Sequence, residues 1–232
     1  LVPLVVEETS VVAALSKTAK WVAEKGQITT ELVGSMWTMG QLHFPGASDV
    51  MRVTEQLQQQ ETFWLKSLHE GAMRGMHARG AGVKEWFLKK ITHPDGQEAV
   101  VFYLLADCGQ AMGANSITQA CAALKPMFER ITGHRVGMGI VSNYNPSACY
   151  RAQITVDEPD QALRAGIVTA SAFAQADIHR ACTHNKGILN GVDAIMMATG
   201  NDWRAVSAAL HAHAARDGVY RGLSTWQSKG AK

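Results

Sequence analysis

Two apolar runs, VKEWFLKKI at residues 83–91 and EAVVFYLLAD at residues 98–107, lie on either side of His93-Pro94-Asp95-Gly96. Their β-branched and aromatic residues favour strands, and the Pro-Asp-Gly sequence favours a turn. Together they predict a β-hairpin with a loop longer than two residues. The second run leads directly into QAMGAN at residues 110–115.

The segments around the hairpin extend it into a larger α+β unit. We expect, in chain order, a strand at 35–44, a long helical run at 48–78, the hairpin, a helix at 116–132 and a strand at 135–142. This strand, helix, strand, strand, helix, strand order is typical of a ferredoxin-like fold. We place the ferredoxin-like domain at residues 37–143.

The flanking residues are predicted to be mainly helical. A cap at Thr9 or Ser10 predicts a helix that runs to Lys25, and residues 148–156 suggest one further strand. The predicted fold class is therefore α+β, with the ferredoxin-like domain inserted into a discontinuous, mainly helical large domain made of residues 1–36 and 144–232.

Composition narrows the class of protein. The 232 residues are 47% apolar and 18% charged, which predicts a globular core, and a net charge of +2 argues against nucleic acid as a partner. Apolar runs are too short to cross a bilayer. The cysteines form no Cys-x-x-Cys pair and no zinc spacing, so we expect a cytoplasmic protein with reduced thiols and no metal site. The four cysteines are Cys108, Cys121, Cys149 and Cys182.

The stretches THNKGILNGVD at residues 183–193 and ATGNDWRA at residues 198–205 combine a lysine, a carboxylate and several amides. A fixed cation such as Lys186, with Asp202 near it in sequence, suits a reaction in which a carbonyl gathers negative charge. Taken alone, Lys186 is also compatible with a solvated loop, and Asp202 with the N-cap of a helix that begins at Trp203.

These stretches, together with VEETSVVAA at residues 6–14 and QAMGAN at residues 110–115, resemble class II (bacterial-type) 3-hydroxy-3-methylglutaryl-CoA (HMG-CoA) reductase. The motifs stand in the family's order. Two positions depart from its pattern, since Thr9 replaces a usual proline and Gln110 a usual aspartate. The resemblance also implies that longer family members carry an N-terminal segment and a C-terminal portion with a catalytic histidine, which no histidine of this sequence matches.

The resemblance implies a catalytic set. Lys186 would polarise the thioester carbonyl and stabilise the oxyanion, and Asp202 would tune the ionisation of its neighbours. Glu8 would donate a proton to the developing alcohol, with Glu7 as its competitor. Without the resemblance, either glutamate is equally compatible with a solvated carboxylate that precedes a helix.

The resemblance implies binding residues for the hydroxymethylglutaryl group as well. A guanidinium can pair with its free carboxylate, and neutral groups can bond its hydroxyl. The matching positions are Ser10, Arg180 and Asn190. Arg180 alone is also compatible with an ordinary cation at a helix C-terminus. We expect His184 and Asn185 to shape the loop of the lysine.

The resemblance implies that residues 37–143 form a small NAD(P)-binding domain. No Gly-x-Gly-x-x-Gly is present, so the site is not a Rossmann site; the matching residues are Met112, Gly113, Ala114, Asn115 and Asn143. A position that holds an aspartate in an NADH-using relative aligns near Met73, with Arg74 and Arg79 close by. Cations there favour NADPH over NADH.

The implied reaction is the NAD(P)H-dependent four-electron reduction of HMG-CoA to mevalonate and CoA, or its reverse, as in isoprenoid biosynthesis through the mevalonate pathway. The implied assembly is a homodimer or a higher homo-oligomer. The alternative is a non-catalytic or partner-dependent paralogue that binds CoA or nucleotide, which Gln110 and the unmatched histidine keep open.

Overall fold

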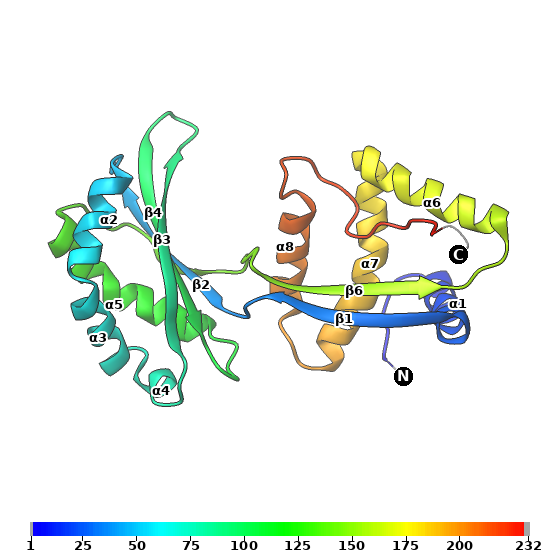
Figure 1. Ribbon diagram of the computed structural model, residues 1–232, viewed down its shortest axis with the longest axis horizontal. Coiled ribbons are helices and arrows are strands. Elements are labelled where there is room, and N and C mark those ends of the chain that lie inside the picture. The colour runs from blue at the N-terminus through cyan, green and yellow to red at the C-terminus, as the bar shows by residue number, and fades with distance from the viewer. Residues whose placement is uncertain (1, 230–232) are drawn as a thin grey trace. The chain divides into compact units, whose positions relative to one another are not determined.

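The computed structural model describes residues 2–229. The chain folds as two compact units, one of residues 34–149 and one of residues 1–33 with 150–232 (Figure 1). Each unit has its own sheet. The architecture confirms the predicted α+β fold class.

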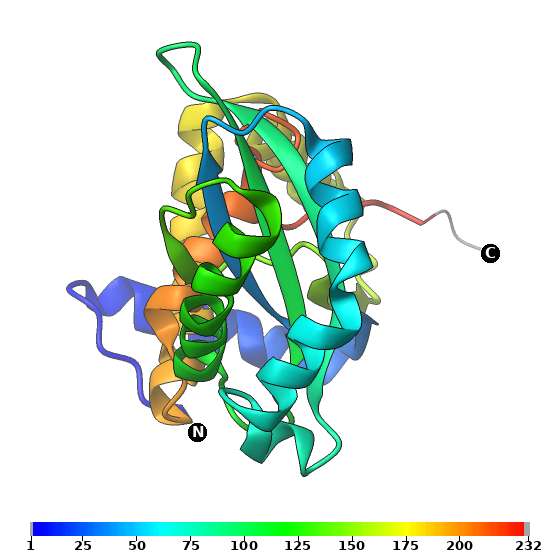
Figure 2. The same cartoon turned by 90° about the vertical axis from the view of Figure 1, so that its left-hand side faces the viewer.

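The unit of residues 34–149 contains an antiparallel four-stranded sheet. Its strands are β2 (Thr38–Pro45), β3 (Gly82–Thr92), β4 (Glu98–Asp107) and β5 (Gly139–Ser142), and its helices are α2 (Val50–Gln59), α3 (Glu61–Glu70), α4 (Arg74–His77) and α5 (Ala114–Thr132). The sheet order is β3-β4-β2-β5, and α2, α3 and α5 lie over one of its faces (Figure 2). Chain order and sheet order are those of a ferredoxin-like fold.

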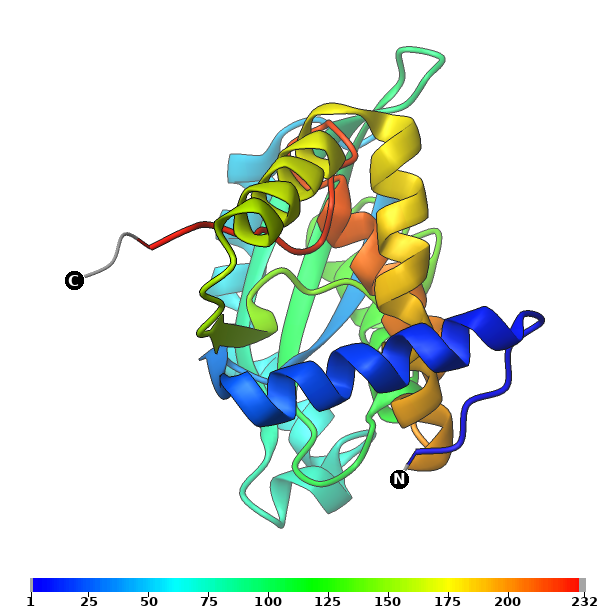
Figure 3. The same ribbon diagram turned by 90° about the vertical axis from the view of Figure 1, so that its right-hand side faces the viewer.

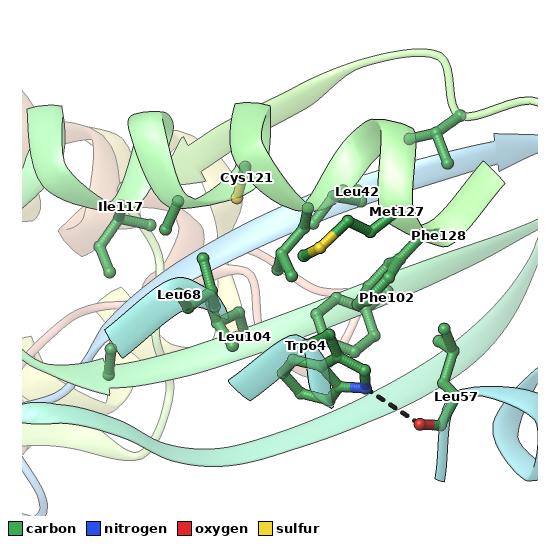
Figure 4. Close-up of a cluster of buried hydrophobic side chains, with 14 of the residues drawn as sticks. Leu42, Leu57, Trp64, Leu68, Phe102, Leu104, Ile117, Cys121, Met127 and Phe128 are labelled. Carbon is green, nitrogen blue, oxygen red and sulfur yellow. Dashed lines mark hydrogen bonds between the residues drawn. The ribbon is translucent and has the colours of Figure 1, made fainter. Parts of the chain in front are cut away.

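The core of this unit lies between the sheet and its helices. Strand β4 is almost wholly buried because it pairs with β3 on one side and β2 on the other. The indole of Trp64 contacts the rings of Phe102 and Phe128 at centroid distances of 6.0 and 5.5 Å and donates a hydrogen bond to the Leu57 carbonyl (Figure 4). These aromatic and aliphatic side chains fix the sheet whose strand β4 leads into α5.

The single helix expected at residues 48–78 is wrong, because the structure has three shorter helices there. The first break is at Gln60, whose φ of −110° and ψ of 12° are not helical. At the end of α2 the Leu57 carbonyl accepts a hydrogen bond from the Gln60 N–H at 3.3 Å and a second one from the Trp64 indole at 2.9 Å, so packing supports the break. The strand expected at residues 135–142 is also shorter, since β5 is Gly139–Ser142.

The second unit is mainly helical. It contains α1 (Thr9–Lys25), β1 (Gly26–Gly34), β6 (Ala148–Val156), α6 (Gln161–Ala176), α7 (Ile178–Ala198) and α8 (Trp203–Ala214), of which the two strands form a sheet of their own. Figure 3 shows α1, α6 and α7 of this unit. The predicted capping of α1 by Thr9 or Ser10 is wrong, because the cap position is Glu8, whose side chain makes no capping bond.

Candidate active site and nucleotide loop

Lys186 lies inside helix α7 and not in a loop, which corrects the sequence-based expectation. Asp177 is the N-cap of helix α7, and its carboxylate accepts a hydrogen bond from the Arg180 backbone N–H at 2.7 Å. It continues through Gly187, where an added Cβ would meet no atom within 4 Å. The Lys186 ammonium is exposed and donates to the carboxylate of Glu7 at 3.2 Å.

The two neighbouring glutamates have different partners. Glu7 pairs with Lys186, whereas the carboxylate of Glu8 accepts a hydrogen bond from the Ser10 hydroxyl at 2.5 Å. A hydrogen bond from its own backbone N–H, followed by the Lys186 ammonium, holds the pKa of Glu7 below its usual value. The structure therefore brings Lys186 to Glu7, the residue that the sequence ranked second.

Asp202 occupies the N-cap of α8, as its alternative interpretation predicted. Its carboxylate accepts from the Ala205 backbone N–H at 3.1 Å and lies 3.9 Å from the Arg204 guanidinium. The cap bond fixes the direction of this carboxylate and is compatible with a second role for it.

The residues matched to the hydroxymethylglutaryl group lie on two elements. Ser10 is in the first turn of α1, and Arg180 and Asn190 are on α7. Arg180 stands in the first turn of α7, so its interpretation as a helix C-terminal cation is wrong. Asn190 follows Lys186 by four residues, which places both on the same face of the helix.

The other side of α7 is held by a segment at residues 221–226. Asn185 is fully buried, donates to the Arg221 carbonyl at 2.9 Å and accepts from the Leu223 N–H at 2.8 Å. His184 bonds the Ser224 hydroxyl at 2.9 Å, and burial, followed by the Arg180 charge, lowers the pKa of His184. The residues that directly precede Lys186 thus anchor its helix. No sequence motif indicated their partners.

Residues 108–113, called the nucleotide loop after the sequence-based prediction, follow β4 and lead into α5. The Asp107 carboxylate accepts from the Gly109 N–H at 2.8 Å, and Gly113 takes the N-cap position with a φ of 88°. A Cβ at Gly113 would overlap the sulfur of Cys108, so the position has room only for glycine. No side chain caps this helix start in the described structure. The first N–H groups of α5 therefore have no side-chain acceptor.

The register places Asn143 at the same edge of the sheet. Both Ala106 at the end of β4 and Ser142 at the end of β5 pair with the first residues of β2. Asn143 directly follows Ser142 and is exposed, as are Met112 and Asn115. The sheet therefore gathers the sequence-predicted nucleotide residues at one edge.

Two arginines lie on the segment that borders this loop. A Cβ at Gly109 would contact Ala81 at 3.9 Å, and Gly82 pairs with Asp107. Arg74 and Arg79, shortly before Ala81, are exposed. Met73, near which the aspartate position of the NADH-using relative aligns, is only 1% exposed because it packs in the core.

A match to the family described as hydroxymethylglutaryl-coenzyme A reductase covers residues 1–231. The chain belongs to this family. The 3-hydroxy-3-methylglutaryl-coenzyme A reductase of Archaeoglobus fulgidus is 36% identical over 230 residues, which are 98% of this chain and 52% of the relative. The probable reductase of Borreliella burgdorferi is 27% identical over 96% of this chain and 51% of its own length.

Solved structures of the hydroxymethylglutaryl-coenzyme A reductase family agree in fold. The Streptococcus pneumoniae reductase superposes with a TM-score of 0.89 at 37% identity, over 98% of this chain and 55% of that one. The class II S. pneumoniae enzyme described as bound to NADPH in open conformations superposes with a TM-score of 0.88 at 36% identity. The match covers 97% of this chain and 62% of that one. The chain spans about half the length of its curated relatives. Across residues 2–229, no helix has both the length and the apolar character needed to span a membrane.

Proposed function

We propose that the polypeptide carrying this sequence is an HMG-CoA reductase, which reduces HMG-CoA to mevalonate and CoA with NADPH or NADH, or runs the reverse reaction. The contact between Lys186 and Glu7 carries this proposal. It joins the two motifs of the resemblance, VEETS and THNKGI, across 179 residues of sequence. Family membership and the nucleotide loop support the same function.

Lys186 is the electrophile of the proposed reaction. Its ammonium projects from a helix that Asn185 and His184 anchor, so the backbone that carries the charge is held in place. A cation held in place stabilises an oxyanion without the reorganisation that water would need. The thioester carbonyl oxygen, which becomes negative as hydride is added, is its proposed partner.

Glu8 is the proposed proton donor, and the contacts of Glu7 support this assignment. A hydrogen bond from its own backbone N–H, followed by the Lys186 ammonium, holds the pKa of Glu7 below its usual value, so Glu7 stays ionised near neutral pH and makes a poor acid. In our proposal Glu7 positions the lysine, while Glu8 gives a proton to the new alcohol. Asp202, whose carboxylate is directed by its cap bond, is the third proposed catalytic residue, with the role that the resemblance implies for it.

Ser10, Arg180 and Asn190 are the proposed contacts of the hydroxymethylglutaryl group. Asn190 shares a helical face with Lys186, so it can bond the tertiary hydroxyl while the lysine holds the carbonyl. Arg180 supplies the cation that a free carboxylate needs.

The start of α5 fits a dinucleotide. Its first N–H groups have no side-chain cap and its first turn holds no acidic residue, which suits a pyrophosphate. We assign this contact to Met112, Gly113, Ala114 and Asn115, with Asn143 at the same edge. A bound nicotinamide nucleotide supplies the hydride.

We infer a preference for NADPH, because Arg74 and Arg79 lie on the segment that borders the loop and can accept a 2′-phosphate. The S. pneumoniae relative is described as bound to NADPH. We also propose a homodimer in the cytoplasm, as the resemblance implies.

Two matched substitutions test the proposal. Glu8→Gln should abolish HMG-CoA-dependent oxidation of NADPH, whereas Glu7→Gln should lower turnover less and leave a measurable rate. Both remove one charge from adjacent positions, so each controls for the other. A larger loss in Glu7→Gln would transfer the proton-donor role to Glu7. Ligand binding without oxidation in the unsubstituted polypeptide would support a non-catalytic paralogue instead.

A further inference from the structure

Two histidines meet on the ferredoxin-like unit, away from the nucleotide loop. The Nε2 atoms of His43, on β2, and His93, which follows β3, lie 3.2 Å apart. Their ring centroids are 5.2 Å apart at an interplanar angle of 77°. His93 stands at the turn before β4, and the nucleotide loop follows the far end of the same strand. The pair is thus separate from the proposed nucleotide contacts.

The backbone places His43 on the face of the sheet opposite the core. Its neighbours Leu42 and Phe44 are both fully buried against the helices, and side chains alternate along a strand. Both histidines are partly buried, so solvent reaches the pair. Without a metal, one neutral imidazole donates its N–H to the other.

The same spacing suits two ligands of one metal ion. Zinc binds imidazole nitrogen at about 2.0–2.1 Å, so two nitrogens on a tetrahedral ion lie about 3.3 Å apart. We propose that His43 and His93 form a two-imidazole site for Zn²⁺ or a similar divalent transition-metal ion. When the metal binds, the imidazole that donated its Nε2 proton changes tautomer and carries that proton on its Nδ1. Both Nε2 lone pairs are then available to the metal, and no net proton is released.

Water completes the coordination. Within residues 2–229, no group of three or more His, Cys, Asp or Glu side chains is placed to hold a metal. The two ligands come from different elements and stand 50 residues apart, which is why no sequence spacing indicated them. An ion bound here joins the tip of the β3–β4 hairpin to β2, so its role is to hold the hairpin.

Zinc titration of the purified polypeptide tests this site. His43→Gln and His93→Gln should each lose the same single equivalent of bound Zn²⁺, and the double variant should lose no more than either. His134→Gln removes another histidine of this unit and should bind as the unsubstituted protein does. Zn²⁺ should also slow amide exchange at residues 93–97 in the unsubstituted protein and in His134→Gln, but in neither of the other single variants.

Equal zinc stoichiometry in all variants, or an equal loss in His134→Gln, would overturn the site. A second measurement does not depend on the folding of variants. Electron paramagnetic resonance of Cu²⁺ added to the unsubstituted protein should show coupling to two imidazole nitrogens, and a spectrum with none or one would also overturn the proposal.

Discussion

Gly113→Ala should destabilise the ferredoxin-like unit and weaken nucleotide binding together. The left-handed φ of 88° costs an alanine about 1–2 kcal/mol. The new Cβ would overlap the sulfur of Cys108 and lie 2.8 Å from its Cβ, which adds about 1–3 kcal/mol of overpacking. The expected loss in free energy of unfolding is therefore about 2–5 kcal/mol.

Gly133→Ala is the matched control at the other end of α5. Gly133 has a φ of 72°, but a Cβ there meets nothing within 4 Å, so only the conformational cost of about 1–2 kcal/mol applies. Urea denaturation gives both free energies, and NADPH titration gives both affinities. Equal destabilisation by the two substitutions, or unchanged NADPH affinity in Gly113→Ala, would refute the packing argument for the loop.

Other substitutions test the remaining contacts. Asn185→Ala should lower the free energy of unfolding by about 1–3 kcal/mol, because two backbone groups lose their partner; an equal effect of Asn201→Ala, at an exposed position, would contradict this. Glu158 has a lowered pKa because it accepts from the Trp21 indole, Lys25 and the Asp160 N–H. Its stabilisation is present above its ordinary pKa of 4.5 and disappears as pH falls through the lower folded value. Acid thermal melts of Glu158→Gln should therefore be less steep in pH than those of the unsubstituted protein, and identical slopes would disprove the linkage. Arg79→Glu should raise the Kd for NADPH more than that for NADH, and a parallel rise would exclude a 2′-phosphate contact.

Local signals predicted the hairpin and most of the ferredoxin-like unit. The runs at residues 83–91 and 98–107 combine strand formers with a turn sequence, and the structure pairs them as β3 and β4. Strand β1 was not predicted, because its residues are almost all exposed and show no alternation of burial. Its pairing with β6 comes from residues far apart in sequence, which no local window contains.

For the candidate active site, too, the sequence predicted only part of the structure. The sequence was compatible with a loop around Lys186, but the helix continues through Gly187 and Gly191, where an added Cβ would meet no atom within 4 Å. The resemblance identified the two glutamates, yet adjacent residues on an extended backbone point in different directions. Which one faces Lys186 is decided by tertiary packing, and sequence order alone does not encode it.

HMG-CoA-dependent oxidation of NADPH, followed with the unsubstituted polypeptide and with Lys186→Ala, tests the central claim most directly. We predict two NADPH oxidised for each mevalonate formed, with turnover abolished in Lys186→Ala while its folding is unchanged. Substantial turnover in Lys186→Ala, or binding of both ligands by the unsubstituted polypeptide without oxidation, would contradict the account.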